Sequence, residues 1–452
     1  MIRRAIEQYH ALLERDERAT QEMAERIEDQ LRRRDLKFGK EFVRISLRPH
    51  FVSPAQMHDL RRACSVLVGS FAKVERLALQ DPAVMSRLGF EGEERELVRV
   101  EHGFPGSAIF SRLDCFFARR GFRFVEFNVD SPAGGAYLDD LQRILLAEPL
   151  VQEFSGSYRL GAHNSRERIL AALLRCYELW GGQDKPRIAI VDWHGVSTVS
   201  EFELLREYFE AAGFPAVICD PRELELREGR LHAAGLPVDI IYKRVVVTEL
   251  LAKRDEVAAL IEAARRNLIC MVNPFRGKIV NVKALFDILT HERYRSQFTT
   301  RERAVIKDHI PWTRRVEEAR TYYRGSKIDL PAFIRRNRSH LVLKPNDDYG
   351  GKGIYLGWEC TDEQWESAVK VAMSACYVVQ ERVPVAEELF PIWDNGLRFV
   401  PYRYDTDPYF FGGEMAGCLA RLSLSSLLNV TAGGAFVPTF EIRKIAGRRR
   451  KR

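Results

Sequence analysis

A short segment near residue 120 carries two acidic residues with a spacing suited to metal chemistry. Residues 109–128 alternate apolar and polar side chains on both sides of residues 119–121, which predicts two strands joined by a turn. Asp114 and Glu126 are equidistant from the centre of this turn, so a tight hairpin places them directly opposite each other. Two opposed carboxylates repel each other and require a compensating positive charge.

Asn128 and Arg112 complete this pattern. Side chains two residues apart share a strand face, so Asn128 joins Glu126 and Asp114, and Arg112 falls opposite Asn128. Two carboxylates and an amide oxygen are hard ligands of the kind that Mg²⁺ accepts, which makes this a candidate metal site. The alternative is a surface hairpin on which Arg112 neutralises the two acids.

A glycine-rich loop follows an apolar strand that ends at Lys344. Gly350, Gly351, Lys352 and Gly353 form the loop, and the next strand begins after it. Glycine lets backbone N–H groups approach phosphate oxygens closely, and Lys344 could hold a phosphate as a point charge. The loop does not open a helix, so it is neither a Walker loop nor a dinucleotide fingerprint. The alternative is an ordinary glycine hairpin.

Two weaker signals follow along the chain. An apolar strand over residues 377–383 turns into a connector whose Gln380, Glu381 and Val383 could bind an adenine edge. Glu388, or its neighbour Glu387, follows where a ribose could be held. Arg421 stands between Gly412-Gly413 and the Asn429 to Gly434 series, where an arginine between glycine turns suits an anionic intermediate. Taken alone, each is more typical of structural strands and turns.

The elements that must position these residues differ along the chain. Residues 1–36 and 53–98 have helical periodicity, and Ser53-Pro54 predicts a helix start. Residues 186–247 are typical of a β-α-β-β unit, which implies an open parallel α/β sheet. A helix is expected around 283–289, and strands dominate after residue 340.

Composition limits the classes of protein to consider. A chain of 452 residues exceeds one ordinary core, so we expect two or three lobes. No stretch approaches the roughly 20 apolar residues of a membrane span, and the acidic helical sequence after Arg3 and Arg4 predicts no signal peptide. Eight scattered cysteines without a CxxC pair indicate a reduced, cytoplasmic protein. The net charge of +7 belongs to a basic tail over 443–452, expected to be disordered.

Together these segments resemble the ATP-grasp family. Lys283 and Lys344 resemble its two ATP-binding lysines, residues 350–353 its phosphate-covering loop, and residues 380–383 its adenine connector. Because the acidic set precedes the lysines, the order resembles the circularly permuted group that includes glutathionylspermidine synthetase and the type 2 permuted proteins. This resemblance implies an α/β chain with α+β elements, built as a circularly permuted ATP-grasp fold.

The same resemblance implies roles for individual residues. Asp114, Glu126 and Asn128 match the magnesium ligands of that group, and Arg112 and Ser131 match its glutathione-side residues. No amidase domain and no polyamine-binding acid cluster are recognisable, so glutathione and spermidine are not carried over.

The implied organisation has five parts. We expect a helical N-terminal region over 1–100, metal-binding strands over 101–160, an open α/β substrate lobe over 161–290, a nucleotide-binding lobe over 291–442 and the tail over 443–452. By fold analogy, His194 and Ser197 face the carboxylate substrate, although His194 is equally typical of a loop histidine without a role.

The resulting hypothesis is an ADP-forming carboxylate–amine ligase that uses ATP and Mg²⁺. Phosphate would pass to a carboxylate, and an amine would attack the acyl phosphate, with Arg112 and Arg421 stabilising the developing charge. The partners expected are a small-molecule or peptide acid and an amine; no membrane is expected, and nucleic acid only through the tail. The alternatives are a kinase-like phosphotransferase, a non-catalytic nucleotide-binding scaffold and a nucleic-acid binder acting through the tail.

Overall fold

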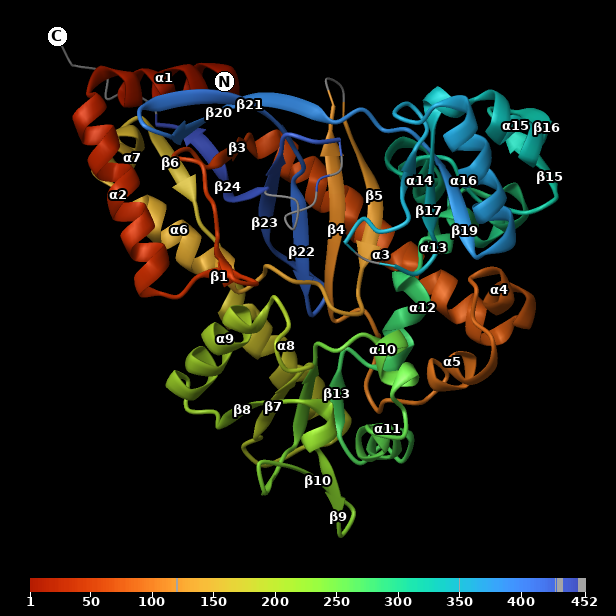
Figure 1. Ribbon diagram of the computed structural model, residues 1–452. Helices are drawn as coiled ribbons and strands as arrows, with labels where there is room; N and C mark the ends of the chain where they lie inside the picture. The colour runs from red at the N-terminus through yellow and green to blue at the C-terminus, as the bar shows by residue number, and fades with distance from the viewer. Residues whose placement is uncertain (119–120, 349, 427, 429–433, 446–452) are drawn as a thin grey trace.

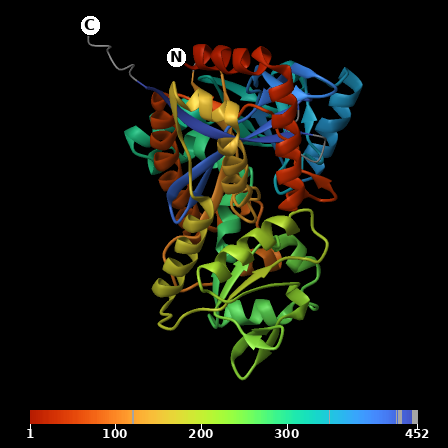
Figure 2. The same ribbon diagram turned by 90° about the vertical axis from the view of Figure 1, so that its left-hand side faces the viewer.

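The computed structural model describes residues 1–118, 121–348, 350–426, 428 and 434–445. A nine-stranded sheet occupies the upper part of Figure 1, with helices on its left. An α/β lobe lies below it, and a lobe with a four-stranded antiparallel sheet lies to the right. Figure 2, turned by 90°, shows the α/β lobe projecting from the rest. The mixed α/β class expected from the sequence is confirmed. No helix of the described ranges is long and apolar enough to cross a membrane.

The N-terminal region is mainly helical, as its periodicity predicts. Ser53 begins the longest of these helices with a capping box shared with Gln56, and a proline occupies the first turn. Three short strands, which the sequence analysis did not predict, interrupt the helices. The elements are α1 (Ile2–Arg15), α2 (Glu17–Arg33), β1 (Lys37–Phe38), β2 (Glu41–Phe42), β3 (His50–Val52), α3 (Pro54–Gln80), α4 (Pro82–Arg87) and α5 (Gly92–Leu97).

The large sheet combines strands from distant parts of the chain. Its main path has the order β20-β21-β23-β22-β4-β5, and β24 pairs with β23, β3 and β6. The predicted hairpin is therefore one edge of a sheet whose other strands come mostly from the C-terminal part. The remaining strands are β4 (Phe110–Phe117), β5 (Phe122–Asn128), β6 (Tyr158–Gly161), β20 (Ala386–Trp393), β21 (Leu397–Tyr404), β22 (Asp407–Phe411), β23 (Glu414–Ser423) and β24 (Ala435–Lys444).

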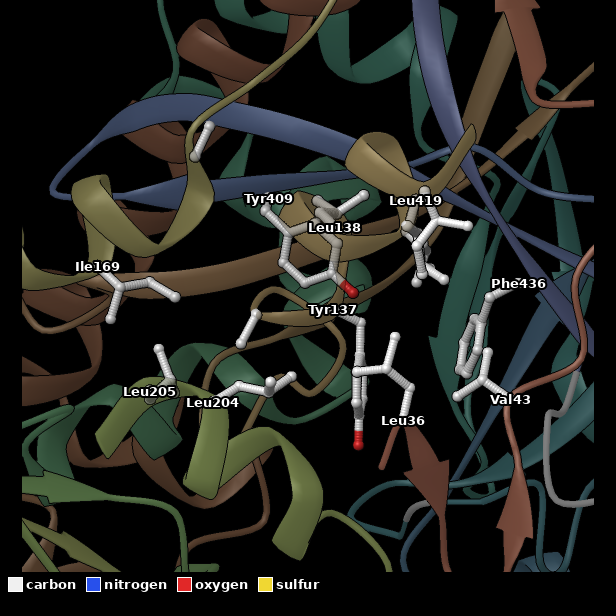
Figure 3. Close-up of a cluster of buried hydrophobic side chains, with 14 of the residues drawn as sticks. Leu36, Val43, Tyr137, Leu138, Ile169, Leu204, Leu205, Tyr409, Leu419 and Phe436 are labelled. Atoms are coloured by element: carbon white, nitrogen blue, oxygen red, sulfur yellow. The ribbon is translucent and has the colours of Figure 1, made fainter. Parts of the chain in front are cut away.

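A shared hydrophobic core joins this sheet to the N-terminal helices and to the α/β lobe. Helices α6 (Tyr137–Ala147), α7 (Pro149–Ser155) and α8 (Ser165–Trp180) pack against it. Figure 3 shows side chains from widely separated parts of the chain close together in this core. The labelled residues are Leu36, Val43, Tyr137, Leu138, Ile169, Leu204, Leu205, Tyr409, Leu419 and Phe436.

The α/β lobe contains a parallel sheet of order β13-β12-β7-β8, which confirms the predicted open parallel arrangement. A small antiparallel sheet, β9 to β11, was not predicted, because its strands are two to four residues long. The elements are β7 (Ile188–Val191), α9 (Val199–Ala211), β8 (Ala216–Cys219), β9 (Glu225–Arg227), β10 (Arg230–Ala233), β11 (Leu236–Pro237), β12 (Ile240–Lys243), α10 (Val247–Ala252), α11 (Ala258–Arg265) and β13 (Cys270–Val272).

The right-hand lobe of Figure 1 follows a helical connection. Its antiparallel sheet has the order β14-β19-β17-β18. The elements are α12 (Lys278–Asn281), α13 (Ala284–Thr290), α14 (Thr300–His309), β14 (Thr313–Arg315), β15 (Arg320–Tyr323), β16 (Ser326–Asp329), α15 (Leu330–Arg336), β17 (Leu341–Pro345), β18 (Tyr355–Leu356), α16 (Asp362–Ser374) and β19 (Tyr377–Glu381).

Candidate active site

The β4–β5 hairpin has the register that its spacing predicts. Asp114 pairs with Glu126 and Arg112 pairs with Asn128, with a bulge directly after Asp114. Residues 119–120 of the predicted turn lie outside the described residues. The hairpin therefore brings both acids, the amide and the arginine to one place.

Cationic side chains compensate the opposed carboxylates. Asp114 Oδ1 accepts hydrogen bonds from Arg112 Nε and Asn128 Nδ2, both at 2.9 Å, and its Oδ2 accepts from an Arg421 Nη atom at 2.7 Å. Burial alone would raise the pKa of Asp114, but the two arginines hold it below its ordinary value. Glu126 pairs with Lys283 Nζ at 2.9 Å. The neutralisation by Arg112 that the sequence left open is thus present, and Arg421 and Lys283 extend it.

The predicted metal ligands fit a hard divalent cation by their chemistry. Asp114, Glu126 and Asn128 all line one cavity of about 980 Å³ and offer carboxylate and amide oxygens. Within the described ranges there is no group of three or more histidine, cysteine, aspartate or glutamate residues that could hold a metal. A site here would therefore depend on the amide oxygen as well as on the two acids.

Two buried aspartates that the sequence analysis missed hold Arg421 in place. Asp405 Oδ2 accepts from Arg421 Nε at 2.8 Å, its Oδ1 accepts from the Arg421 backbone N–H at 2.8 Å, and Asp407 Oδ2 lies 3.0 Å from Arg421 Nε. Burial raises the pKa of both aspartates. Their signal in the sequence is two acids, two residues apart, at the entry to the apolar strand β22.

Two lysines lie on the nucleotide-binding side expected from the sequence. Lys344, on β17, is 8% exposed and donates from Nζ to Gln380 Oε1 at 2.8 Å. Burial lowers the pKa of Lys344 to about 8, against the opposing effect of Glu126. Lys283 Nζ donates to the backbone oxygen of Asp348 at 2.8 Å, so it links the hairpin acid Glu126 to the glycine-rich loop.

The glycine-rich loop connects two strands and opens no helix, as expected. Gly350, Gly351 and Gly353 have φ values of 73°, 77° and 65°, a region that favours glycine. A Cβ atom at Gly353 would lie 2.8 Å from Tyr377 Oη. Gly350, Gly351 and Lys352 line the cavity, whereas Gly353 does not; Tyr349 lies outside the described residues.

The predicted connector also reaches the cavity, but Glu388 does not. Gln380, Glu381 and Val383 line it. Glu388 belongs to β20, whose pairing with β21 carries it into the large sheet, and there it accepts from Arg48 at 2.5 Å. The structure thus separates Glu388 from the residues with which the sequence analysis grouped it.

The α/β lobe supplies the opposite end of the cavity. Ser131 and Ser197 line it, as expected, but His194 does not; its side chain is 63% exposed and contacts Glu223. Asp192 and Glu249 also line this end and were missed as site residues. Other lining residues here are Phe38, Val196, Thr198, Arg244, Val246 and Thr248.

Comparisons with known proteins establish the fold. No family model matches the sequence, and a search of curated proteins finds no significant match. Among solved structures, a glutathione synthetase-like effector from Globodera pallida is 10% identical, with a TM-score of 0.62 over 94% of this chain and 98% of that one. The chain therefore shares the fold of that glutathione synthetase-like effector, in agreement with the ATP-grasp-like fold that its sequence motifs imply.

Two further structures are similar at lower scores. A putative gamma-glutamylcysteine synthetase from Methylobacillus flagellatus is 13% identical, with a TM-score of 0.43 over 84% of this chain and 86% of that one. The D-cycloserine synthetase DcsG is 15% identical, with a TM-score of 0.31 over 57% of this chain and 75% of that one. The fold assignment rests on the first structure.

Proposed function

We propose that this chain, which has the fold of the ATP-grasp-related ligases, is an ADP-forming carboxylate–amine ligase. The observation that carries the proposal is the convergence on one cavity of Asp114, Glu126, Asn128, Lys344 and the glycine-rich loop. Acids, an amide, a buried lysine and a glycine-rich backbone loop are what a nucleoside triphosphate with its cation requires. Because the hairpin precedes both lysines in the chain, we also propose the circularly permuted order and the five-part division expected from the sequence, except that Arg443 and Lys444, expected in the tail, belong to β24.

The nucleotide would lie between β17, β19 and the glycine-rich loop. Lys344 and Lys283 would neutralise phosphate charge, and the connector at Gln380 and Glu381 would contact the base. Asp114, Glu126 and Asn128 would hold Mg²⁺, which supplies positive charge at the phosphates when bound. Positioning and charge stabilisation account for most of the catalysis of phosphoryl transfer, so the protein needs no covalent intermediate of its own.

The acid substrate would bind on the hairpin side of the cavity. Arg112 and Arg421 already hold Asp114 between them, so a new negative charge beside Asp114 would lie near two fixed cations. An acyl phosphate and the oxyanion formed when an amine attacks it are such charges. Ser131 and Ser197 line the same cavity and would contact the acid.

All eight cysteines are free, which supports the expected reducing, cytoplasmic location.

Thermal melting with nucleotide tests the first half of the proposal. We expect ADP or a non-hydrolysable ATP analogue to raise the melting temperature in a Mg²⁺-dependent way, because a ligand at 100 times its dissociation constant adds about 2.7 kcal/mol. Lys344→Ala should remove the shift. Lys327→Ala, at an exposed position of β16 in the same lobe, should leave it intact. No shift in the unaltered protein at millimolar nucleotide would refute nucleotide binding and leave a scaffold.

Turnover tests the second half. ADP release is measured with pooled carboxylic acids and hydroxylamine, which traps an acyl phosphate as a hydroxamate. Acid-dependent hydroxamate formation supports the ligase, and its loss in Asp114→Ala and Glu126→Ala supports the metal assignment. A stable phosphorylated product that hydroxylamine does not trap would instead favour the kinase-like phosphotransferase.

A further inference from the structure

The α/β lobe presents a ligand crevice at a defined point of its sheet. From β7 the chain moves to β8 on one side, and it later returns to β12 on the other side. In open parallel sheets of this kind, ligands bind outside the carboxyl ends of the strands where the strand order reverses. That point lies between β7 and β12. Asp192 directly follows β7, Glu249 lies on α10 just after β12, and both line the cavity.

Asp192 has no cationic partner of its own among the described residues. The only hydrogen bond to its carboxylate there comes from the Trp193 backbone N–H at 2.8 Å. The two nearby cations are engaged elsewhere: Arg244 with Glu201 at 3.2 Å, and Lys243 with Asp130 at 2.5 Å. A carboxylate at a cavity wall that lacks an ion pair is available to a positively charged ligand.

The surroundings of Asp192 also suit proton exchange near neutral pH. Burial raises the pKa of Asp192 to about 6, Glu249 raises it further, and the Trp193 N–H, Arg244 and Lys243 act in the opposite direction. Glu249 is itself held by the Trp193 indole N–H at 2.7 Å. A base with a pKa close to the working pH is the most effective proton acceptor.

On the premise of the proposed function, we propose that Asp192 is the base that deprotonates the amine substrate, which enters the crevice as an ammonium ion. Its carboxylate takes one proton from the ammonium, and the freed nitrogen lone pair attacks the acyl carbon. The C–N bond forms, the C–O bond to phosphate breaks, and the second proton leaves with the phosphate. Glu249 adds negative charge that attracts the ammonium.

Two kinds of nucleophile, which differ in charge, distinguish this catalytic role from a structural one. Hydroxylamine is largely neutral at neutral pH and requires no base, whereas ammonium chloride, methylamine and 1,3-diaminopropane enter as cations. Using the acid identified by hydroxamate formation, product formation with each nucleophile is measured for the unaltered chain, Asp192→Asn and Asp255→Asn. Asp255 is an acid of the same lobe whose side chain is 96% exposed.

In Asp192→Asn, we expect amide formation with the cationic amines to fall by about 100-fold or more, so that the ratio of hydroxamate to amide product rises at least tenfold. The low-pH limb of amide formation near pH 6 should also disappear. Asp255→Asn should change neither. An equal loss with both kinds of nucleophile, or no loss with the amines, would overturn the inference, as would an unaltered chain that uses hydroxylamine but none of the amines. If no acid yields hydroxamate, the proposed function itself fails.

Discussion

A buried ion pair ties the α/β lobe to the strand that carries the candidate metal ligands, and breaking it has a predictable cost. Lys243 has no exposed surface on its side chain and donates to Asp130 Oδ1 at 2.5 Å, to the Asp130 backbone oxygen at 3.1 Å and to the Val245 backbone oxygen at 3.0 Å. Asp130 has further partners, Lys278 at 3.3 Å and the Val247 N–H at 2.9 Å. The two residues should therefore respond unequally to substitution.

Asp130→Asn removes the only carboxylate that pairs with Lys243 within the described residues. An uncompensated buried charge costs about 3–5 kcal/mol. Lys243→Met leaves Asp130 with Lys278 and the Val247 N–H, so only the contacts of one ammonium are lost, at about 1–3 kcal/mol. The double variant no longer contains the unpaired charge of Lys243. Its loss in free energy of unfolding should therefore be smaller than the sum of the losses in the two single variants by roughly 1–3 kcal/mol.

Calorimetric melting of the four proteins measures these differences. For a cooperative unit of 150–250 residues, 1 kcal/mol corresponds to about 2–4 °C, so Asp130→Asn should lower the melting temperature by on the order of 10 °C. Added salt should change little, because the pair is shielded from solvent. Glu93→Gln is the control: it breaks an ion pair to Arg254, whose two side chains are 36% and 56% exposed, and should cost under about 1 kcal/mol. The reasoning would be refuted if Asp130→Asn and Lys243→Met lowered the free energy of unfolding equally and if the double variant lowered it by their sum.

Two further predictions concern the nucleotide side. Burial lowers the pKa of Lys344 from its ordinary 10.5 to about 8 in the folded protein. Between these two pH values the unfolded chain binds more protons than the folded chain. The contribution of Lys344 to the free energy of unfolding should therefore rise with pH across this range. A bound phosphate should restore the positive charge of Lys344, so nucleotide binding near pH 8, where about half of this lysine is neutral, should take up about half a proton. Calorimetry in buffers of different ionisation enthalpy detects this uptake, and a buffer-independent heat would contradict it. Gly353→Ala should reduce the nucleotide-induced rise in melting temperature at least threefold. The reason is that φ at Gly353 is 65° and the new Cβ atom would lie 2.8 Å from Tyr377 Oη. An unchanged rise would show that the loop need not adopt this conformation.

The parts of the site that the sequence predicts are those fixed by local contacts. The pairing of Asp114 with Glu126 follows from alternation and turn position, and the structure has this register. The helix start at Ser53-Pro54 is equally local. A period of two along a strand and the chemistry of a helix start need no knowledge of the rest of the chain.

The missed residues depend on contacts between distant segments. Asp405 and Asp407 reach Arg421, which also pairs with Asp114, only because β22 pairs with both β23 and β4, and no local pattern reveals these neighbours. Glu388 shows the opposite error: its distance in sequence from Gln380 is short, but β20 leaves the nucleotide lobe and joins the large sheet. Proximity along the chain was a poor guide where the chain crosses between sheets.

The charges at the centre of the site suggest how it could accept a charged ligand without a large rearrangement. Four basic and four acidic side chains share one largely buried region: Arg112, Arg421, Lys283 and Lys344 with Asp114, Glu126, Asp405 and Asp407. A nucleotide brings both phosphate charge and a divalent cation. If Glu126 exchanges Lys283 for the cation while Lys283 turns to phosphate, every buried charge keeps a partner throughout. Desolvation makes an orphaned charge far more costly than an exchange of partners. The ion pairs seen in the hairpin are therefore compatible with the metal binding that we propose for Asp114, Glu126 and Asn128.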